Sequence, residues 1–104
     1  MRYLNLKEWE EAFKKDKKAV ILDVRSQEEY DLEHIPGAKL VNVQNPQKFM
    51  DEIEQLDKDH TYFVYCRTGN RSAQACQVLD FNGFKNIFGL EGGFERWKSE
   101  HIEN

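Results

Sequence analysis

The chain has 104 residues, 39% of them hydrophobic, and a formal net charge of −4 with a sequence pI of about 5.4. This length fits one domain over residues 1–104, and the acidic balance gives no support for nucleic-acid binding, which normally uses a basic face. The amino-terminal residues lack the apolar core of a signal peptide and no later segment reaches membrane-spanning length, so we expect a cytoplasmic protein without membrane contact.

The first third of the chain alternates between helical and strand-like patterns. Asn5 and Glu8 form a capping-box pattern ahead of apolar residues at helical spacing, which predicts a first helix. Residues 19–22 are a continuous apolar run and predict a buried strand. Ser26 and Glu29 form a second capping box, which predicts a short helix.

The remaining chain continues this alternation. The patterns predict strands at residues 39–43, 61–65 and 87–88. They also predict three helices: one capped by Asn45 with Pro46 at its first position, a second from Ser72 to Asn82, and a last one anchored by Phe94, Trp97 and Ile102. Strands that alternate with helices are typical of a parallel sheet covered by helices, so the predicted fold class is α/β.

The segment that follows the strand at residues 61–65 carries the clearest chemical signal. The strand ends on Cys66, Gly69 lies in the middle of the loop, and four residues separate Cys66 from Arg71. Peptide N–H groups of a tight glycine-containing loop can turn inward, and the positive end of the following helix points to the same place. Such fields stabilise a thiolate, and ligands of open α/β sheets bind at the carboxyl ends of strands. We therefore interpret Cys66 as the candidate nucleophile.

At these residues the chain resembles the rhodanese (sulfurtransferase) family. Three segments in the family's order carry the likeness, at residues 22–38, 66–72 and 90–97. The resemblance implies a five-stranded parallel sheet flanked by helices on both faces. It also implies sulfur transfer, because family members that move sulfur have four residues between the cysteine and the basic position, as Cys66 and Arg71 do.

The resemblance implies a reaction in two half-reactions. The thiolate of Cys66 attacks the outer sulfur of thiosulfate, or of a low-molecular-weight or protein persulfide, and a thiol or cyanide acceptor then takes the sulfur from the Cys66 persulfide. The implied partners are a small-molecule donor and a thiol acceptor, which can be a protein. No metal or cofactor is required.

The rest of the loop forms the candidate substrate-binding set. The guanidinium fork of Arg71 matches two oxygens of a sulfonate. Arg67 is a second candidate, or a contact for an acidic partner protein if its side chain points outward. The hydroxyl of Ser72 is as easily explained as the N-cap of its helix. The inward N–H groups of the loop are expected to stabilise the negative charge, first on the thiolate of Cys66 and then on its persulfide. The binding set is Arg71, Arg67, Thr68, Gly69, Asn70 and Ser72.

Other reactive or polar residues receive a structural interpretation. Cys76 lies at core spacing on its helix, and without a CxxC or Cys/His pairing both cysteines are expected to be free thiols. Asp23 and Arg25 follow a buried strand and are expected to pair locally, with Glu29 within reach of Arg25. We expect His34 to form a hydrogen bond with a turn rather than act as a base.

Two alternative functions stay open. The first is a binding or regulatory module that keeps the fold without catalysis, but family members of that kind usually lack the cysteine, which is present here as Cys66. The second is a phosphatase or arsenate reductase on the same fold. Those enzymes have a loop one residue longer, because a tetrahedral oxyanion needs a wider cradle.

Overall fold

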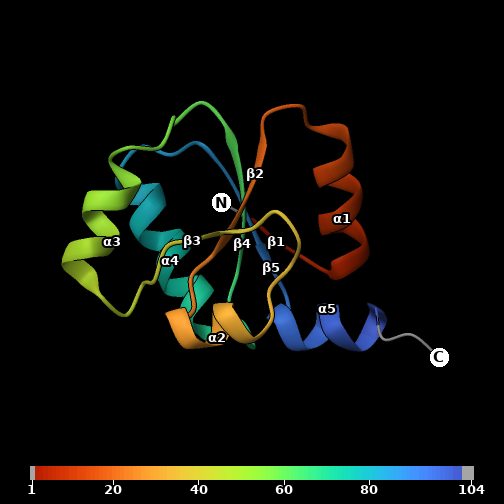
Figure 1. Ribbon diagram of the computed structural model, residues 1–104. Coiled ribbons are helices and arrows are strands. Elements are labelled where there is room, and N and C mark those ends of the chain that lie inside the picture. The colour runs from red at the N-terminus through yellow and green to blue at the C-terminus, as the bar shows by residue number, and fades with distance from the viewer. Residues whose placement is uncertain (1, 102–104) are drawn as a thin grey trace.

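The computed structural model describes residues 2–101 and contains a five-stranded parallel sheet with helices on both faces (Figure 1). The strands are β1 (Arg2–Leu4), β2 (Ala19–Asp23), β3 (Lys39–Leu40), β4 (Thr61–Tyr65) and β5 (Asn86–Leu90). The helices are α1 (Leu6–Lys15), α2 (Gln27–Leu32), α3 (Pro46–Ile53), α4 (Asn70–Phe81) and α5 (Gly93–His101). The predicted α/β class is confirmed.

Strand β4 lies at the centre of the sheet, whose order is β1-β5-β4-β2-β3. It pairs in parallel with β2 on one side and β5 on the other, and all of its residues are buried. A strand covered on both faces reads as a continuous apolar and aromatic run, which explains the composition of residues 61–65. In Figure 1 the strand ends close to α2 and α5, which lie together across the lower end of the sheet.

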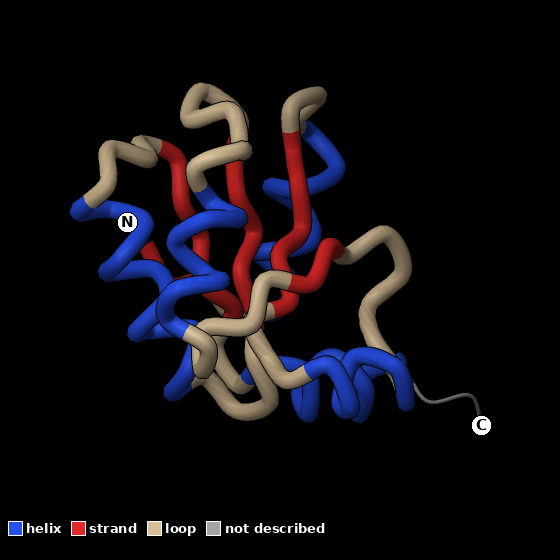
Figure 2. Tube along the Cα trace, turned by 60° about the vertical axis from the view of Figure 1, so that its left-hand side comes forward, coloured by secondary structure: helices blue, strands red, loops and turns tan. Residues whose placement is uncertain are grey.

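Successive residues of β4 contribute to two separate cores, because side chains alternate between the faces of a strand. Tyr62 and Val64 belong to the core that contains residues of α3 and α4. Phe63 and Tyr65 belong to the other core, with residues of α1 and α5. Trp9 of α1 packs edge-on against Phe63, with the two ring centroids 5.7 Å apart. Figure 2 shows the strands enclosed between these two groups of helices.

Both predicted capping boxes are present. The side chain of Asn5 accepts a hydrogen bond from the N–H of Glu8 at 2.9 Å, and Glu8 in turn accepts from the N–H of Asn5. Ser26 and Glu29 form the same reciprocal pair at the start of α2. None of the helices in residues 2–101 combines the length and apolar character that crossing a membrane requires.

The structure departs from the predicted elements at several boundaries. Strand β1 was not predicted, since three residues give too short a pattern, and β5 is longer than residues 87–88. Strand β3 ends at Leu40 rather than at residue 43, although the N–H groups of Val41 and Val43 still donate to carbonyls of Asp23 and Val24. Helix α4 begins at Asn70 instead of Ser72. The predicted anchor Ile102 lies outside the described residues.

Candidate active site

Cys66 follows β4 directly, and its residue surface is only 1% exposed. The backbone N–H of Gly69 donates a hydrogen bond to its Sγ at 3.0 Å, and Ser72 Oγ lies 3.6 Å from the same sulfur. Gly69 has a φ of +123°, a conformation that residues with a side chain rarely adopt. The loop therefore turns back on the sulfur and directs at least one peptide N–H at it.

Helix α5 holds the outer side of this loop. The N–H of Phe94 donates to the carbonyl of Cys66 at 2.7 Å, and that of Glu95 donates to the carbonyl of Arg67 at 3.1 Å. Because the C=O and N–H of a trans peptide point in opposite directions, the N–H groups of Arg67 and Thr68 point away from α5. The start of α5 thus binds two carbonyls of the loop and leaves the N–H groups of the same peptides free of contact with this helix.

Gly93 makes this close approach possible, a role that the sequence alone did not indicate. Its φ is +58°, and a Cβ atom added to it would lie 2.5 Å from the carbonyl oxygen of Cys66. No side chain fits between α5 and the loop at this point. The sequence signal was the Gly92-Gly93 pair, but its contact with the loop depends on tertiary structure.

The first turn of α4 completes the cradle. Gly69 occupies the N-cap position without a side-chain cap bond, and Ser72 is the third residue of the helix. The interpretation of Ser72 as an N-cap is therefore wrong, and its hydroxyl instead donates to the carbonyl of Gly69 at 3.0 Å. The leading N–H groups of a helix have no intrahelical partners, so the positive end of α4 faces the loop.

Arg71 does not project freely into the cradle. Its two Nη atoms donate to the two carboxylate oxygens of Glu29 at 2.7 and 2.9 Å, and one of them also reaches Gln44 Oε1 at 3.3 Å. This hydrogen bond with Arg71, aided by those from Ser26, lowers the pKa of Glu29 to about 2. The predicted pairing of Glu29 with Arg25 is wrong, because α2 presents Glu29 to the loop instead.

The other loop residues of the predicted set lie on the outer surface. Thr68 and Asn70 are exposed, and the side chain of Arg67 is 63% exposed, with its Nε 3.4 Å from Glu95. The structure therefore brings Gly69 and Ser72 to the sulfur of Cys66, and Glu29 holds Arg71 beside them. Arg67, Thr68 and Asn70 face outward.

A buried network supports the residue that precedes the cysteine. Asp23 accepts hydrogen bonds from the guanidinium of Arg25 and, at 2.6 Å, from the hydroxyl of Tyr65. Tyr65 also accepts from the N–H of Ile35, while Arg25 donates to the carbonyl of Glu33. Burial and the hydrogen bond to Asp23 raise the pKa of Tyr65. The expected local pairing of Asp23 and Arg25 is confirmed.

His34 and Cys76 both have structural surroundings. Nδ1 of His34 lies 2.8 Å from the carbonyl oxygen of Tyr30, and the two rings stack at 3.8 Å. His34 therefore forms a backbone hydrogen bond as expected, but its partner belongs to α2 and not to a turn. Cys76 is fully buried in the core between α4 and the sheet, and burial raises the pKa of its thiol to about 12. Both cysteines are free thiols.

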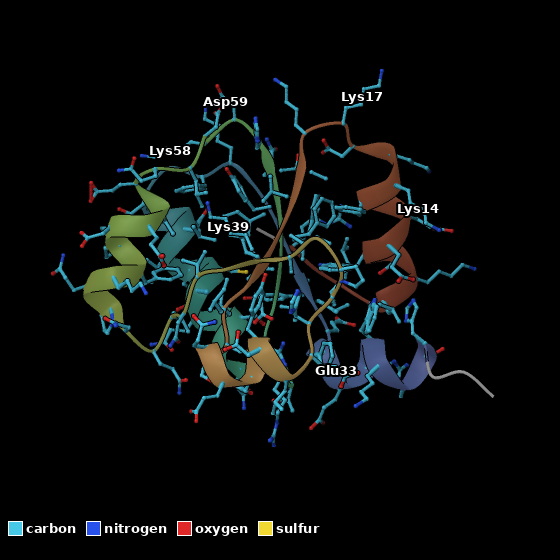
Figure 3. The ribbon with its side chains drawn as sticks, viewed as in Figure 1. Lys14, Lys17, Glu33, Lys39, Lys58 and Asp59 are labelled. Carbon is cyan, nitrogen blue, oxygen red and sulfur yellow. The ribbon has the colours of Figure 1, made fainter. Side chains whose placement is uncertain are left out.

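A groove of about 420 Å³ lies beside the loop, between α2 and α5. Arg67, Phe94 and Glu95 form the side nearest the loop, and Glu33 pairs with Lys98 across it at 2.6 Å. Figure 3 shows Glu33 at this end of the molecule, whereas Lys17, Lys58 and Asp59 lie at the other end of the sheet.

Comparisons with known proteins agree with this geometry. The family model described as Rhodanese-like domain matches residues 6–100. Thiosulfate sulfurtransferase GlpE of Coxiella burnetii is 39% identical over 97 residues, which cover 93% of this chain and 86% of the relative. A rhodanese-like domain protein from Staphylococcus aureus superposes with a TM-score of 0.82 at 30% identity, covering 99% of this chain and 97% of that one. A rhodanese-related protein from Thermoplasma volcanium gives a TM-score of 0.83 at 29% identity, covering 99% of this chain and 96% of that one.

The chain therefore belongs to the rhodanese family. Within that family it is an enzyme, a sulfurtransferase, in agreement with the four-residue spacing between Cys66 and Arg71.

Proposed function

We propose that the protein transfers sulfane sulfur by way of a persulfide on Cys66, with thiosulfate or an organic persulfide as donor. The observation that carries the proposal is the hydrogen bond of 3.0 Å from the N–H of Gly69 to Cys66 Sγ. A peptide N–H fixed on a sulfur atom stabilises negative charge there, both on the thiolate and on the persulfide that replaces it.

In the first half-reaction the thiolate of Cys66 attacks the outer sulfur of thiosulfate. A new S–S bond forms on Cys66, the S–S bond of thiosulfate breaks, and sulfite leaves with the bonding electron pair. With an organic persulfide as donor, the same bond exchange releases a thiolate. We assign Arg71 to the sulfonate oxygens of thiosulfate, with Arg67 as the second candidate, because a guanidinium matches two anionic oxygens.

In the second half-reaction an acceptor thiolate, or cyanide, attacks the outer sulfur of the persulfide and regenerates the Cys66 thiolate. The acceptor is a small thiol or a protein thiol, and the groove between α2 and α5 gives it a place beside the loop. We further propose a cytoplasmic location, because both cysteines are free and a reducing compartment keeps an attacking thiol available.

Intact-protein mass spectrometry after incubation with thiosulfate tests this function. We expect the wild type and Cys76→Ala to gain one sulfur atom, which dithiothreitol removes, and Cys66→Ser to gain none. An adduct that persists in Cys66→Ser would refute the assignment of Cys66. If neither thiosulfate nor glutathione persulfide produced an adduct on the wild type, the proposed mechanism would be wrong, and hydrolysis of an arylphosphate would then be measured.

A further inference from the structure

The charges around the loop are paired with one another rather than left for a substrate. In the described part of the chain, each arginine near Cys66 has a carboxylate partner: Arg25 with Asp23, Arg67 with Glu95, and Arg71 with Glu29. A dianion such as thiosulfate that enters the loop must therefore compete with a protein carboxylate for a guanidinium. Backbone N–H groups and the end of α4 supply the remaining positive field.

The Arg71–Glu29 pair is the strongest competitor in direct contact with the loop. It has two charge-assisted hydrogen bonds at 2.7 and 2.9 Å, and the side chains are only 23% and 27% exposed. The Arg67–Glu95 pair is longer, at 3.4 Å, and both of its side chains are mostly exposed. Bidentate, partly buried pairs hold more firmly than exposed single contacts, so Arg71 is less available than Arg67.

Glu29 is itself held in place. Its Oε1 accepts hydrogen bonds from the N–H and the hydroxyl of Ser26 at 3.1 Å, in the capping box of α2. The carboxylate is therefore oriented toward Arg71 by the start of a helix. Releasing Arg71 to a sulfonate would leave this partly buried carboxylate without its cation, which opposes thiosulfate binding.

We propose that Glu29 sets the donor specificity of the Cys66 loop: by holding Arg71 it disfavours thiosulfate and leaves the site better suited to an organic persulfide. The inference rests on the proposed function and concerns the same site. An organic persulfide has no sulfonate, so its terminal sulfur needs the N–H of Gly69 that faces Cys66 and not the guanidinium of Arg71. Glu29 acts here through Arg71, as a positioning residue.

The variant Glu29→Gln tests this role. Glutamine at the third helical position still supplies the acceptor of a capping box, so α2 is expected to form. The KM for thiosulfate is expected to fall about five-fold, with little change in kcat, because thiosulfate no longer has to break one partly exposed ion pair. The KM for the persulfide of an uncharged thiol is expected to stay within about two-fold of the wild-type value.

Two matched variants carry the same change of charge. Glu28→Gln alters the neighbouring exposed position of α2 and is expected to leave the KM for thiosulfate unchanged. Glu95→Gln frees Arg67 instead of Arg71. If Glu95→Gln lowers the KM for thiosulfate and Glu29→Gln does not, Arg67 binds the sulfonate and the proposal is overturned.

A double-mutant cycle with Arg71→Ala gives a second measurement. We expect Arg71→Ala to raise the KM for thiosulfate more in the Glu29→Gln background than in the wild type, because only there is the guanidinium available. Equal effects of Arg71→Ala in the two backgrounds, or a parallel change in KM for both donors in Glu29→Gln, would overturn the role of Glu29. The proposed function would still hold in that case if Cys66 gained sulfur. Absence of any sulfur adduct on the wild type would instead overturn the proposed function on which the inference rests.

Discussion

The hydroxyl of Tyr65 donates a 2.6 Å hydrogen bond to Oδ2 of Asp23, and the two residues are direct partners in the β2–β4 ladder. Tyr65 immediately precedes Cys66, and its oxygen also accepts from the N–H of Ile35 at 3.1 Å. The bond therefore fixes the end of the strand that delivers the cysteine against the end of its neighbour.

Tyr65→Phe should destabilise the protein, because it removes a donor to buried Asp23 and leaves the N–H of Ile35 without this acceptor. We expect a loss of about 1–3 kcal/mol in the free energy of unfolding. The measurement is a urea unfolding curve with Tyr62→Phe as control. Within residues 2–101, the hydroxyl of Tyr62 makes a single hydrogen bond, to the neutral carbonyl of Asp57. That of Tyr65 bonds both a buried carboxylate and an N–H group, so Tyr62→Phe should lose less stability. Equal losses in the two variants would contradict the role of the buried network.

The contact between α5 and the loop predicts a severe effect of Gly93→Ala. The positive φ costs about 1 kcal/mol for a residue with a side chain, and the added Cβ would also press against the carbonyl of Cys66. Gly37→Ala is the matched control, since Gly37 has a φ of +85° but nothing within 4 Å of the added atom.

Stability and persulfide formation are measured on both glycine variants. Gly37→Ala is expected to lose stability only, with a normal rate of sulfur uptake from thiosulfate. Gly93→Ala is expected to lose more stability and to form the Cys66 persulfide slowly even below its unfolding temperature. A normal rate in Gly93→Ala would mean that α5 does not determine the shape of the loop.

The parts of the fold that the sequence predicted are those set by local chemistry. Capping boxes at Asn5 and Ser26 and the apolar run of β4 depend on neighbouring residues, and the structure has them where expected. Strand β1 depends on its pairing with β5, which lies more than eighty residues further along the chain, so three residues gave no usable pattern.

The same distinction applies to the site. Position and spacing in the sequence were enough to indicate Cys66, Gly69 and the helix that follows. The pairing of Arg71 with Glu29 was not predicted, because Glu29 lies 42 residues earlier in the chain and was placed within reach of Arg25 instead. Arg25 is engaged by Asp23, two residues away, and only the packing of α2 against the loop leaves Glu29 for Arg71.

The lowered pKa of Glu29 predicts a pH dependence of stability. The folded carboxylate binds a proton less readily than the unfolded one, so the pair contributes fully above the ordinary pKa of 4.5 and its contribution is lost as pH falls toward about 2. Unfolding curves of the wild type and Glu29→Gln should therefore differ by roughly 1 kcal/mol near neutral pH and converge in that acid range. A difference that stays constant down to pH 2 would show that Glu29 is not protonated in this window.

The two hydroxyl side chains of the loop should differ in their effect on rate. Ser72 Oγ lies 3.6 Å from Cys66 Sγ and also bonds to the carbonyl of Gly69, whereas Thr68 is exposed. A hydroxyl beside a thiolate can turn to donate to it, and a hydrogen bond to a charged group contributes about 1.5–3 kcal/mol. Because Ser72 shares its hydroxyl with Gly69, we expect the lower end of that range.

Ser72→Ala is therefore expected to slow persulfide formation about ten-fold, while Thr68→Ala leaves the rate unchanged. The rate is measured at saturating thiosulfate by rapid quench and mass spectrometry, and the urea midpoint of each variant separates a loss of rate from a loss of folded protein. Equal rates in the two variants would mean that the sulfur anion is stabilised without help from Ser72, and that its hydroxyl only bonds the carbonyl of Gly69 at the start of α4.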